Sequence, residues 1–161
     1  MPLRDNVYIR KSHVSGNGLY ASRNFIKGQT VFIMRGKMKF IKCETREDAM
    51  SEPNTIGIKK NWWLKPPEPY VYINHSCEPN VGIIGTVTFK ALRKIHKDEE
   101  LFFDYSICEE GDWEMKCKCG SVNCRKIIGS VKTLPRKTFK KYLPFIPRYF
   151  QLVYQRQYKL V

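Results

Sequence analysis

The sequence predicts a mostly β fold of several small sheets with few short helices. Short runs of β-branched and aromatic residues alternate with turn residues such as Gly, Asn and Asp. Four prolines between positions 53 and 69 exclude long regular elements from that stretch. The chain has 161 residues, 42% of them hydrophobic, which fits one domain with a real core and excludes wholesale disorder.

The expected strands are short. In chain order they are residues 7–10, a strand starting at Leu19, residues 30–34, and two strands within 81–92. A turn at Gly16-Asn17-Gly18 joins the first two, Gly28 closes the next turn, and residues 44–49 are expected to form a helical turn.

Two adjacent tryptophans, Trp62 and Trp63, lie in the proline-rich stretch. They are interpreted either as opposite-facing core and surface positions of a strand or as the wall of a substrate channel.

The chain is strongly basic. Lys and Arg number 29 against 15 acids, a net charge of +14. Such a charge attracts polyanions, nucleic acid or an anionic membrane surface, although it also serves solubility alone. No stretch approaches the ~18 apolar residues of a membrane span, and residues 4–6 do not open a signal peptide. We therefore expect an intracellular protein that is not secreted.

Three of the six cysteines, Cys117, Cys119 and Cys124, are spaced C-x-C-x4-C. In a reducing compartment this spacing favours a metal site over disulfides. Cys43 and Cys108 are expected to be small buried hydrophobes.

Four blocks occur in a diagnostic order. They are Gly16–Ala21 (GNGLYA), Tyr72–Asn80 (YINHSCEPN), Glu99–Tyr105 (EELFFDY) and Cys117–Cys124 (CKCGSVNC). Together they resemble the SET-domain protein-lysine methyltransferases with a cysteine-rich post-SET segment, over roughly residues 5 to 129. The resemblance implies the SET fold with its pseudo-knot, a SET domain over 1–107 with a variable insert at about 43–70, a zinc-bound post-SET segment over 108–129, and a basic, helical extension over 130–161.

The implied activity is S-adenosylmethionine-dependent lysine N-methylation of a protein, a histone tail being the family expectation. By resemblance Tyr105 is the catalytic tyrosine, whose hydroxyl stays neutral and orients the amine. Phe103 is expected to alternate with Tyr105 on a strand, so that both point the same way. Phenylalanine at this position implies di- or trimethylation.

The cofactor contacts implied by the resemblance come from two blocks: Gly16, Asn17, Gly18 and Leu19 in the glycine loop, and Asn74 and His75. His75 is a general-base candidate by residue type, but the family pattern makes it structural or cofactor-side. Asn80 and Glu100 are expected to brace the crossing of two segments in the pseudo-knot.

Three cysteines leave a tetrahedral zinc site one ligand short. In the family the motif cysteine, here Cys77, joins Cys117, Cys119 and Cys124. Zinc would then pin the post-SET segment against the Asn74–Cys77 loop and close one side of the lysine channel.

The extension from Lys132 onward lies outside the resemblance. Pro135 and Pro147 suit first helical turns, and apolar residues recur at helical spacing from Phe139 to Ile146. We expect two short helices packed on the domain, or else a DNA-facing or membrane-surface arm or a homodimer contact.

A second functional class stays open, namely a non-catalytic, zinc-stapled SET-like module that binds nucleic acid or a basic peptide. The intact NHSC block and Tyr105 favour the enzyme. A nuclear location follows if the substrate is chromatin.

Overall fold

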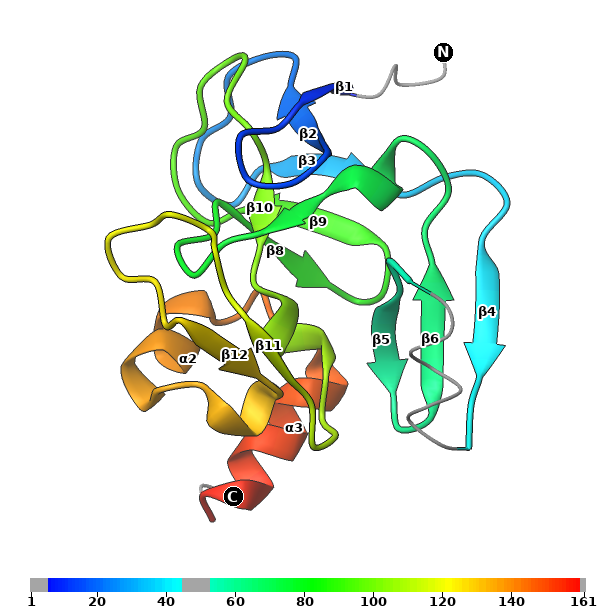
Figure 1. Cartoon of the computed structure of the whole chain (residues 1–161), viewed down its shortest axis with the longest axis vertical. Coiled ribbons are helices and arrows are strands. Elements are labelled where there is room, and N and C mark those ends of the chain that lie inside the picture. Colours follow the sequence, from blue (N-terminus) through cyan, green and yellow to red (C-terminus); the bar gives the residue numbers. More distant parts are fainter. Residues whose placement is uncertain (1–5, 45–52, 160–161) are drawn as a thin grey trace.

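The computed structural model describes residues 6–44 and 53–159 as five small sheets, two α-helices and three short 3-10 helices. Figure 1 shows the β1–β2 hairpin at one end of the molecule and helices α2 and α3 at the other. The mostly β prediction is confirmed. The helical turn predicted for 44–49 falls, apart from Glu44, outside the described residues.

The first two sheets follow the predicted strands. The antiparallel hairpin pairs β1 (Val7–Lys11) with β2 (Asn17–Ala21). The central sheet has the order β3-β9-β8 and consists of β3 (Thr30–Ile33), β8 (Val81–Ile84) and β9 (Thr88–Ala91). β-Branched and aromatic side chains of these strands face the core, where the rings of Phe32 and Phe89 stack 4.4 Å apart.

Within residues 39–65 lies an antiparallel sheet of order β4-β6-β5, of which only a strand at Trp62 and Trp63 was among the expectations. Its strands are β4 (Lys39–Lys42), β5 (Ile56–Lys59) and β6 (Trp62–Lys65). Asn61 has a φ of 61°, a left-handed conformation that asparagine tolerates, and it closes the β5–β6 turn. Figure 1 shows this sheet along one side of the molecule.

Two short strand pairs complete the sheets. β7 (Asn74–His75) runs parallel to β10 (Phe102–Phe103), and β11 (Glu114–Lys116) is antiparallel to β12 (Ile127–Gly129). The 3-10 helices are Tyr70–Tyr72, Tyr105–Cys108 and Val131–Thr133.

The C-terminal extension forms α2 (Arg136–Tyr142) and α3 (Arg148–Gln157), each preceded directly by a proline, Pro135 and Pro147. Their apolar faces belong to the main core, and the rings of Phe139 and Tyr154 stack 3.7 Å apart. The extension therefore forms two short helices packed on the domain, which is the first of the alternatives expected for it.

Two contacts tie this extension to the sheets. The main-chain N–H of Ile83 on β8 donates to the carbonyl of Phe145 at 2.9 Å. Gly57 on β5 lies against the Cys108 carbonyl and the Phe150 ring, so a side chain at this position would not fit. The extension thus packs against β8, an edge strand of the central sheet, and against β5. Among the described residues no helix is both long and apolar enough to span a bilayer.

Candidate functional site

Two sequence blocks meet at the centre of the molecule through main-chain and side-chain hydrogen bonds. The N–H of Ser76 donates to Phe103 O at 3.3 Å, and the N–H of Asn80 donates to Phe102 O at 3.1 Å. The Asn80 amide donates to Glu100 O at 2.7 Å and accepts from Phe102 N at 2.8 Å. Asn80 therefore braces this crossing, as predicted.

Glu100 acts differently from Asn80. Its carbonyl accepts the Asn80 bond, but its carboxylate accepts hydrogen bonds from the Tyr20 hydroxyl at 3.0 Å and from the Asn74 amide at 3.0 Å. The carboxylate thus ties strand β2 to the crossing.

Tyr105 lies at the start of a 3-10 helix, and the prediction that it shares a strand with Phe103 is wrong. Strand β10 ends at Phe103, and Asp104 caps the helix by accepting the Ser106 N–H at 3.1 Å. The turn nevertheless brings the two rings together, with centroids 4.9 Å apart. The Tyr105 hydroxyl donates to Ile73 O at 3.0 Å, and burial raises the pKa of Tyr105 to about 12.

A cavity of about 760 Å³ opens beside these two rings. Phe103, Tyr105, Tyr70 and Trp113 give it an aromatic wall, and strands β5 and β6 supply another side. Trp63 lines the cavity and Trp62 does not, although both are half-buried on β6. Both tryptophans thus lie on a strand, as the first interpretation expected, and Trp63 in addition forms part of the cavity wall.

Acidic side chains line the same cavity. They are Glu109, Glu110 and Asp112, and the same lining also holds the lysines Lys59, Lys60 and Lys132. The Trp63 indole donates to Glu109 at 3.4 Å, and the Tyr149 hydroxyl of α3 donates to Glu110 at 2.9 Å. These contacts orient two carboxylates at the cavity in a chain of net charge +14.

His75 is a buried, neutral imidazole. Its Nδ1 accepts the Tyr105 N–H at 3.1 Å, and its Nε2 lies 3.5 Å from the Cys77 Sγ. Burial lowers the pKa of His75 to about 4, against the opposing effect of Asp104. Both ring nitrogens are engaged in holding the chain, which agrees with a structural role and not with that of a general base.

The glycine loop contacts the crossing at Asn74 and does not line the cavity. The Asn74 amide donates to Ser15 O and Asn17 O, both at 3.1 Å, whereas the preceding residue, Ile73, lines the cavity. Gly16 and Asn17 are exposed, and Gly16 has a positive φ of 51°. This exposed loop of main-chain groups fits a ligand held through its backbone.

Two residues of the predicted loop are not exposed. Gly18 is packed against the Glu100 carboxylate, where a Cβ would collide. The Leu19 side chain is in the core, and its carbonyl accepts the Leu101 N–H at 2.7 Å. Gly16 and Asn17 therefore offer the accessible surface of the loop.

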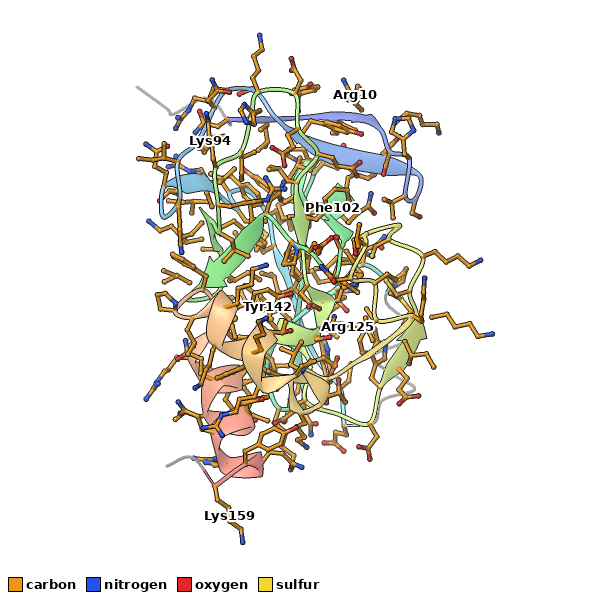
Figure 2. The ribbon with its side chains drawn as sticks, turned by 90° about the vertical axis from the view of Figure 1, so that its left-hand side faces the viewer. Arg10, Lys94, Phe102, Arg125, Tyr142 and Lys159 are labelled. Carbon is orange, nitrogen blue, oxygen red and sulfur yellow. The ribbon has the colours of Figure 1, made fainter. Side chains whose placement is uncertain are left out.

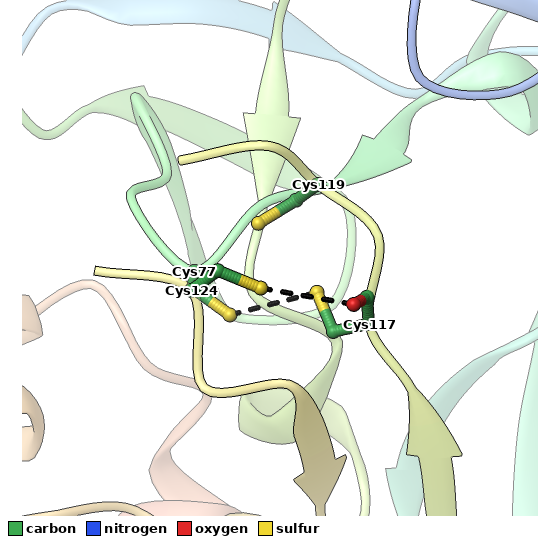
Figure 3. A group of neighbouring side chains, drawn as sticks. All are labelled: Cys77, Cys117, Cys119 and Cys124. Carbon is green, nitrogen blue, oxygen red and sulfur yellow. Dashed lines mark hydrogen bonds between the residues drawn. The ribbon is translucent and has the colours of Figure 1, made fainter. Parts of the chain in front are cut away.

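Four cysteines converge beside the crossing (Figure 3): Cys77, Cys117, Cys119 and Cys124, with Sγ atoms all within 4.8 Å of one another. The Sγ atoms of Cys77 and Cys117 are 3.7 Å apart. A tetrahedral zinc with Zn–S bonds of about 2.3 Å requires sulfur separations of about 3.8 Å. The donor set and the spacing therefore fit zinc.

The thiols of this cluster differ in acidity. Burial raises the pKa of Cys77 and of Cys117. Burial also works against the Cys119 thiolate, but a main-chain group of Cys77 and the Ser121 hydroxyl lower the pKa of Cys119 to about 6. Tyr105 packs against this cluster as well as against the main core, so the cysteines and the cavity share one wall.

Several residues at the site were not singled out from the sequence: Asp104, Glu109, Glu110, Trp113, Arg125 and Tyr142. The sequence offered one signal for them: Asp104 is an acidic residue within the otherwise apolar run Leu101–Tyr105. A carboxylate buried with that run requires hydrogen-bonding partners. The partners themselves, Arg125 and Tyr142, are distant in sequence and follow no motif.

The profile of the SET domain family matches residues 16–106. The chain is 31% identical over 142 residues to histone-lysine N-methyltransferase trr of Drosophila melanogaster, covering 76% of this chain and 6% of that protein. It is 32% identical over 143 residues to histone-lysine N-methyltransferase 2D of Homo sapiens, covering 76% of this chain and 2% of that protein. The chain thus spans a small part of these relatives.

Among solved structures, KRYPTONITE in complex with mCHG DNA and SAH is similar, with a TM-score of 0.56 and 22% identity over 78% of this chain and 29% of that one. At this identity the likeness concerns the fold. Together with the match of the family profile to more than half of the residues, these findings show that the chain belongs to the SET domain family.

Proposed function

We propose that the chain is an S-adenosylmethionine-dependent protein-lysine N-methyltransferase that acts on a histone tail. The observation that carries the proposal is the protonated Tyr105 hydroxyl, fixed on Ile73 O beside an aromatic cavity at the crossing of the two motif blocks. The names of the relatives, histone-lysine N-methyltransferases, support the same reaction.

A lysine side chain entering the cavity would be surrounded by Phe103, Tyr105, Tyr70 and Trp113. A free lysine has a pKa near 10.4, and its charged form is unreactive. An aromatic, dehydrated channel lowers that pKa and favours the neutral amine. When bound, S-adenosylmethionine supplies a methyl carbon that the lysine nitrogen takes as the bond from that carbon to sulfur breaks.

Orientation is the main contribution of the protein in this proposal. The exposed Gly16–Asn17 segment and Asn74, with His75 beside them, would hold the methyl donor on one side of the crossing. Tyr105 and Phe103 would hold the amine on the other side, so that nitrogen, methyl carbon and sulfur are collinear. Such alignment is worth several kcal/mol, roughly 7 to 11 in favourable intramolecular reactions.

Zinc would be held by Cys77, Cys117, Cys119 and Cys124. Its role in this proposal is mechanical, because the cluster packs against Tyr105 and contributes no group to the cavity. Zinc would fix the post-SET segment against the crossing and thereby support one wall of the lysine channel.

The lining of the cavity carries charges of both signs, because Lys59, Lys60 and Lys132 lie there as well as Glu109, Glu110 and Asp112. Glu109 and Glu110 are held in place by Trp63 and Tyr149, and both face a cavity that would receive a lysine. Within this mixed lining, these two oriented carboxylates are the groups that would attract a cation next to the target lysine of a histone tail.

The first experiment is a labelled-methyl transfer assay on core histones and on nucleosomes, with Tyr105→Phe as the paired variant. We expect transfer by the natural chain and a loss of about 100-fold or more in Tyr105→Phe, because the hydroxyl that orients the amine is gone. Absence of transfer together with nucleic-acid or peptide binding would favour the non-catalytic module instead.

Helix α2 favours a second contact, with the DNA of a nucleosome. Arg136, Lys137, Lys140 and Lys141 are all exposed on α2, and the helix contains no acidic residue. Exposed cations of this kind bind phosphates in a salt-dependent way. We expect the double variant Lys140→Glu, Lys141→Glu to bind nucleosomes more weakly and with a smaller salt dependence. Its methyl transfer to a free peptide should be unchanged. Nucleosome binding equal to that of the natural chain would exclude the contact. A nuclear location follows from a chromatin substrate.

A further inference from the structure

Asp104 is a fully buried carboxylate at the centre of a hydrogen-bonded cluster. The Arg125 Nη2 donates to its Oδ1 at 2.7 Å, and the Tyr142 hydroxyl donates to its Oδ2 at 3.0 Å. The Ser106 N–H also donates to Oδ1, at 3.1 Å. A buried carboxylate is tolerated only when such donors surround it, so its position depends on all three.

Asp104 contributes to the position of Tyr105, together with His75 and Ile73 O, which accept the Tyr105 N–H and hydroxyl. Asp104 directly precedes Tyr105 and caps the 3-10 helix that Tyr105 begins. The main-chain carbonyl of Asp104 accepts the Ile107 N–H at 3.1 Å, so both its side chain and its backbone fix this turn. A movement of the carboxylate would therefore be transmitted to the turn that Tyr105 begins.

The two side-chain donors come from outside the part of the chain that matches the family profile, which ends at residue 106. Arg125 follows the last cysteine of the cluster, and Tyr142 is the last residue of α2. Figure 2 shows both side chains at the level where the extension meets the rest of the molecule. Tyr142 is buried, and burial raises the pKa of its hydroxyl well above the usual value, so it remains a donor.

We propose that Tyr142 is a positioning residue for methyl transfer, which acts with Arg125 through Asp104 on the orientation of Tyr105. The C-terminal extension is then part of the catalytic apparatus although it contributes no group to the reaction. This proposal rests on the proposed function for its kinetic consequence, whereas its structural consequence, the fixed position of Tyr105, is independent of any activity.

The kinetic test compares Tyr142→Phe with Tyr154→Phe. Tyr154 is a matched control, because it is another buried tyrosine of the extension whose hydroxyl donates to a main-chain carbonyl, Leu134 O, at 3.2 Å. We expect Tyr142→Phe to lower kcat by about 10- to 100-fold with little change in the affinity for the methyl donor. Tyr154→Phe should lose a similar amount of stability and keep kcat. Equal effects of the two variants on kcat would overturn the proposal.

Arg125 provides a second test of the proposal. If Arg125 and Tyr142 act through the same carboxylate, the double variant Arg125→Lys, Tyr142→Phe should lose less kcat than the product of the two separate losses. Arg125→Lys should retain more activity than Arg125→Met, because a cation still reaches Asp104. Independent, multiplicative effects would show that the two residues do not share this route.

A spectroscopic readout separates this proposal from the proposed function. In protein labelled with 3-fluorotyrosine, the ¹⁹F resonance of Tyr105 is assigned by its loss in Tyr105→Phe. We expect Tyr142→Phe to shift that resonance and Tyr154→Phe to leave it in place. If the natural chain transferred no methyl group but the shift occurred, the proposed function would fail and the positioning link would stand. An unshifted Tyr105 resonance would refute the link.

Discussion

The rings of Phe103 and Tyr105 lie with their centroids 4.9 Å apart and their planes inclined by 49°, and both line the aromatic cavity. Phe103 is 3% exposed and carries no polar group, so it fixes no water beside the Tyr105 hydroxyl. The space beside the Tyr105 hydroxyl is therefore determined by the size of the side chain at position 103.

Phe103→Tyr should shift the products towards monomethyllysine. The added hydroxyl occupies space and orders a water molecule where a partly methylated amine would have to rotate. Mass spectrometry of peptide products at equal total turnover measures the shift, with the natural chain expected to give di- or trimethyllysine. A natural chain that stops at monomethyllysine would contradict our interpretation of Phe103.

The pH profile should rise without a descending limb below about pH 10. Methyl transfer speeds up as the lysine amine loses its proton, whereas Tyr105, with its pKa raised to about 12 by burial, stays protonated. Initial rates between pH 6 and pH 10 at saturating methyl donor provide the measurement. If the rate of the natural chain fell within that range while the chain stayed folded, the Tyr105 hydroxyl would ionise at a lower pH than we expect.

The same shift has a consequence for stability. The folded pKa of Tyr105 lies above its unfolded value near 10, so the protonated form stabilises the fold. This contribution is fully present below about pH 10 and is lost between pH 10 and 12, on the order of 2 kcal/mol. Between pH 8 and pH 11, the free energy of unfolding measured with denaturant should fall more for the natural chain than for Tyr105→Phe.

Cys124→Ser should lower the zinc content and the melting temperature together. The variant removes one of four sulfurs that converge beside Tyr105, and a closed zinc site contributes directly to folding. Cys43→Ser is the matched control, since Cys43 is a buried cysteine outside the cluster. Elemental analysis should give about one zinc per chain for the natural protein and for Cys43→Ser.

Removal of the metal should also slow methyl transfer, because the cluster supports the wall on which Tyr105 rests. A chelator that strips zinc while turnover and donor affinity stay constant would contradict this coupling.

Glu110→Gln should raise KM for a basic peptide roughly 2- to 5-fold and leave kcat near its natural value, because a partly exposed carboxylate contributes modestly to ion pairing. Gln keeps an acceptor for the Tyr149 hydroxyl, so the helix contact survives. Glu114→Gln is the control, since Glu114 is exposed on β11 and does not line the cavity. Equal KM values for the two variants would remove Glu110 from substrate binding.

The elements that sequence patterns predicted were those with local signals. Alternating and β-branched runs predicted the strands at 7–11, 30–33 and 81–91, and the two prolines marked the helices of the extension. Strands β4 and β5 and the β11–β12 pair were not predicted, because their short runs mix lysine, glycine or glutamate with the apolar residues and show no clear alternation. In such segments the pairing partner, and not the local sequence, determines the conformation.

Tyr105 shows a limit of the periodicity argument. A period of two across Phe103 and Tyr105 implied a common strand face, but Asp104 between them is buried and caps a 3-10 helix. The carboxylate could turn inwards only because Arg125 and Tyr142 were there to receive it, and neither is adjacent in sequence.

By itself the sequence determined the family, the identity of the two blocks that cross, and the cysteines that suit a metal, because these depend on residue types at short spacings. Only the tertiary structure decided what surrounds them: which tryptophan faces the cavity, where the acidic side chains gather, and that the extension reaches Asp104. Those relationships join residues 21 to 46 positions apart, and they follow from how the sheets and helices pack, which no local pattern encodes.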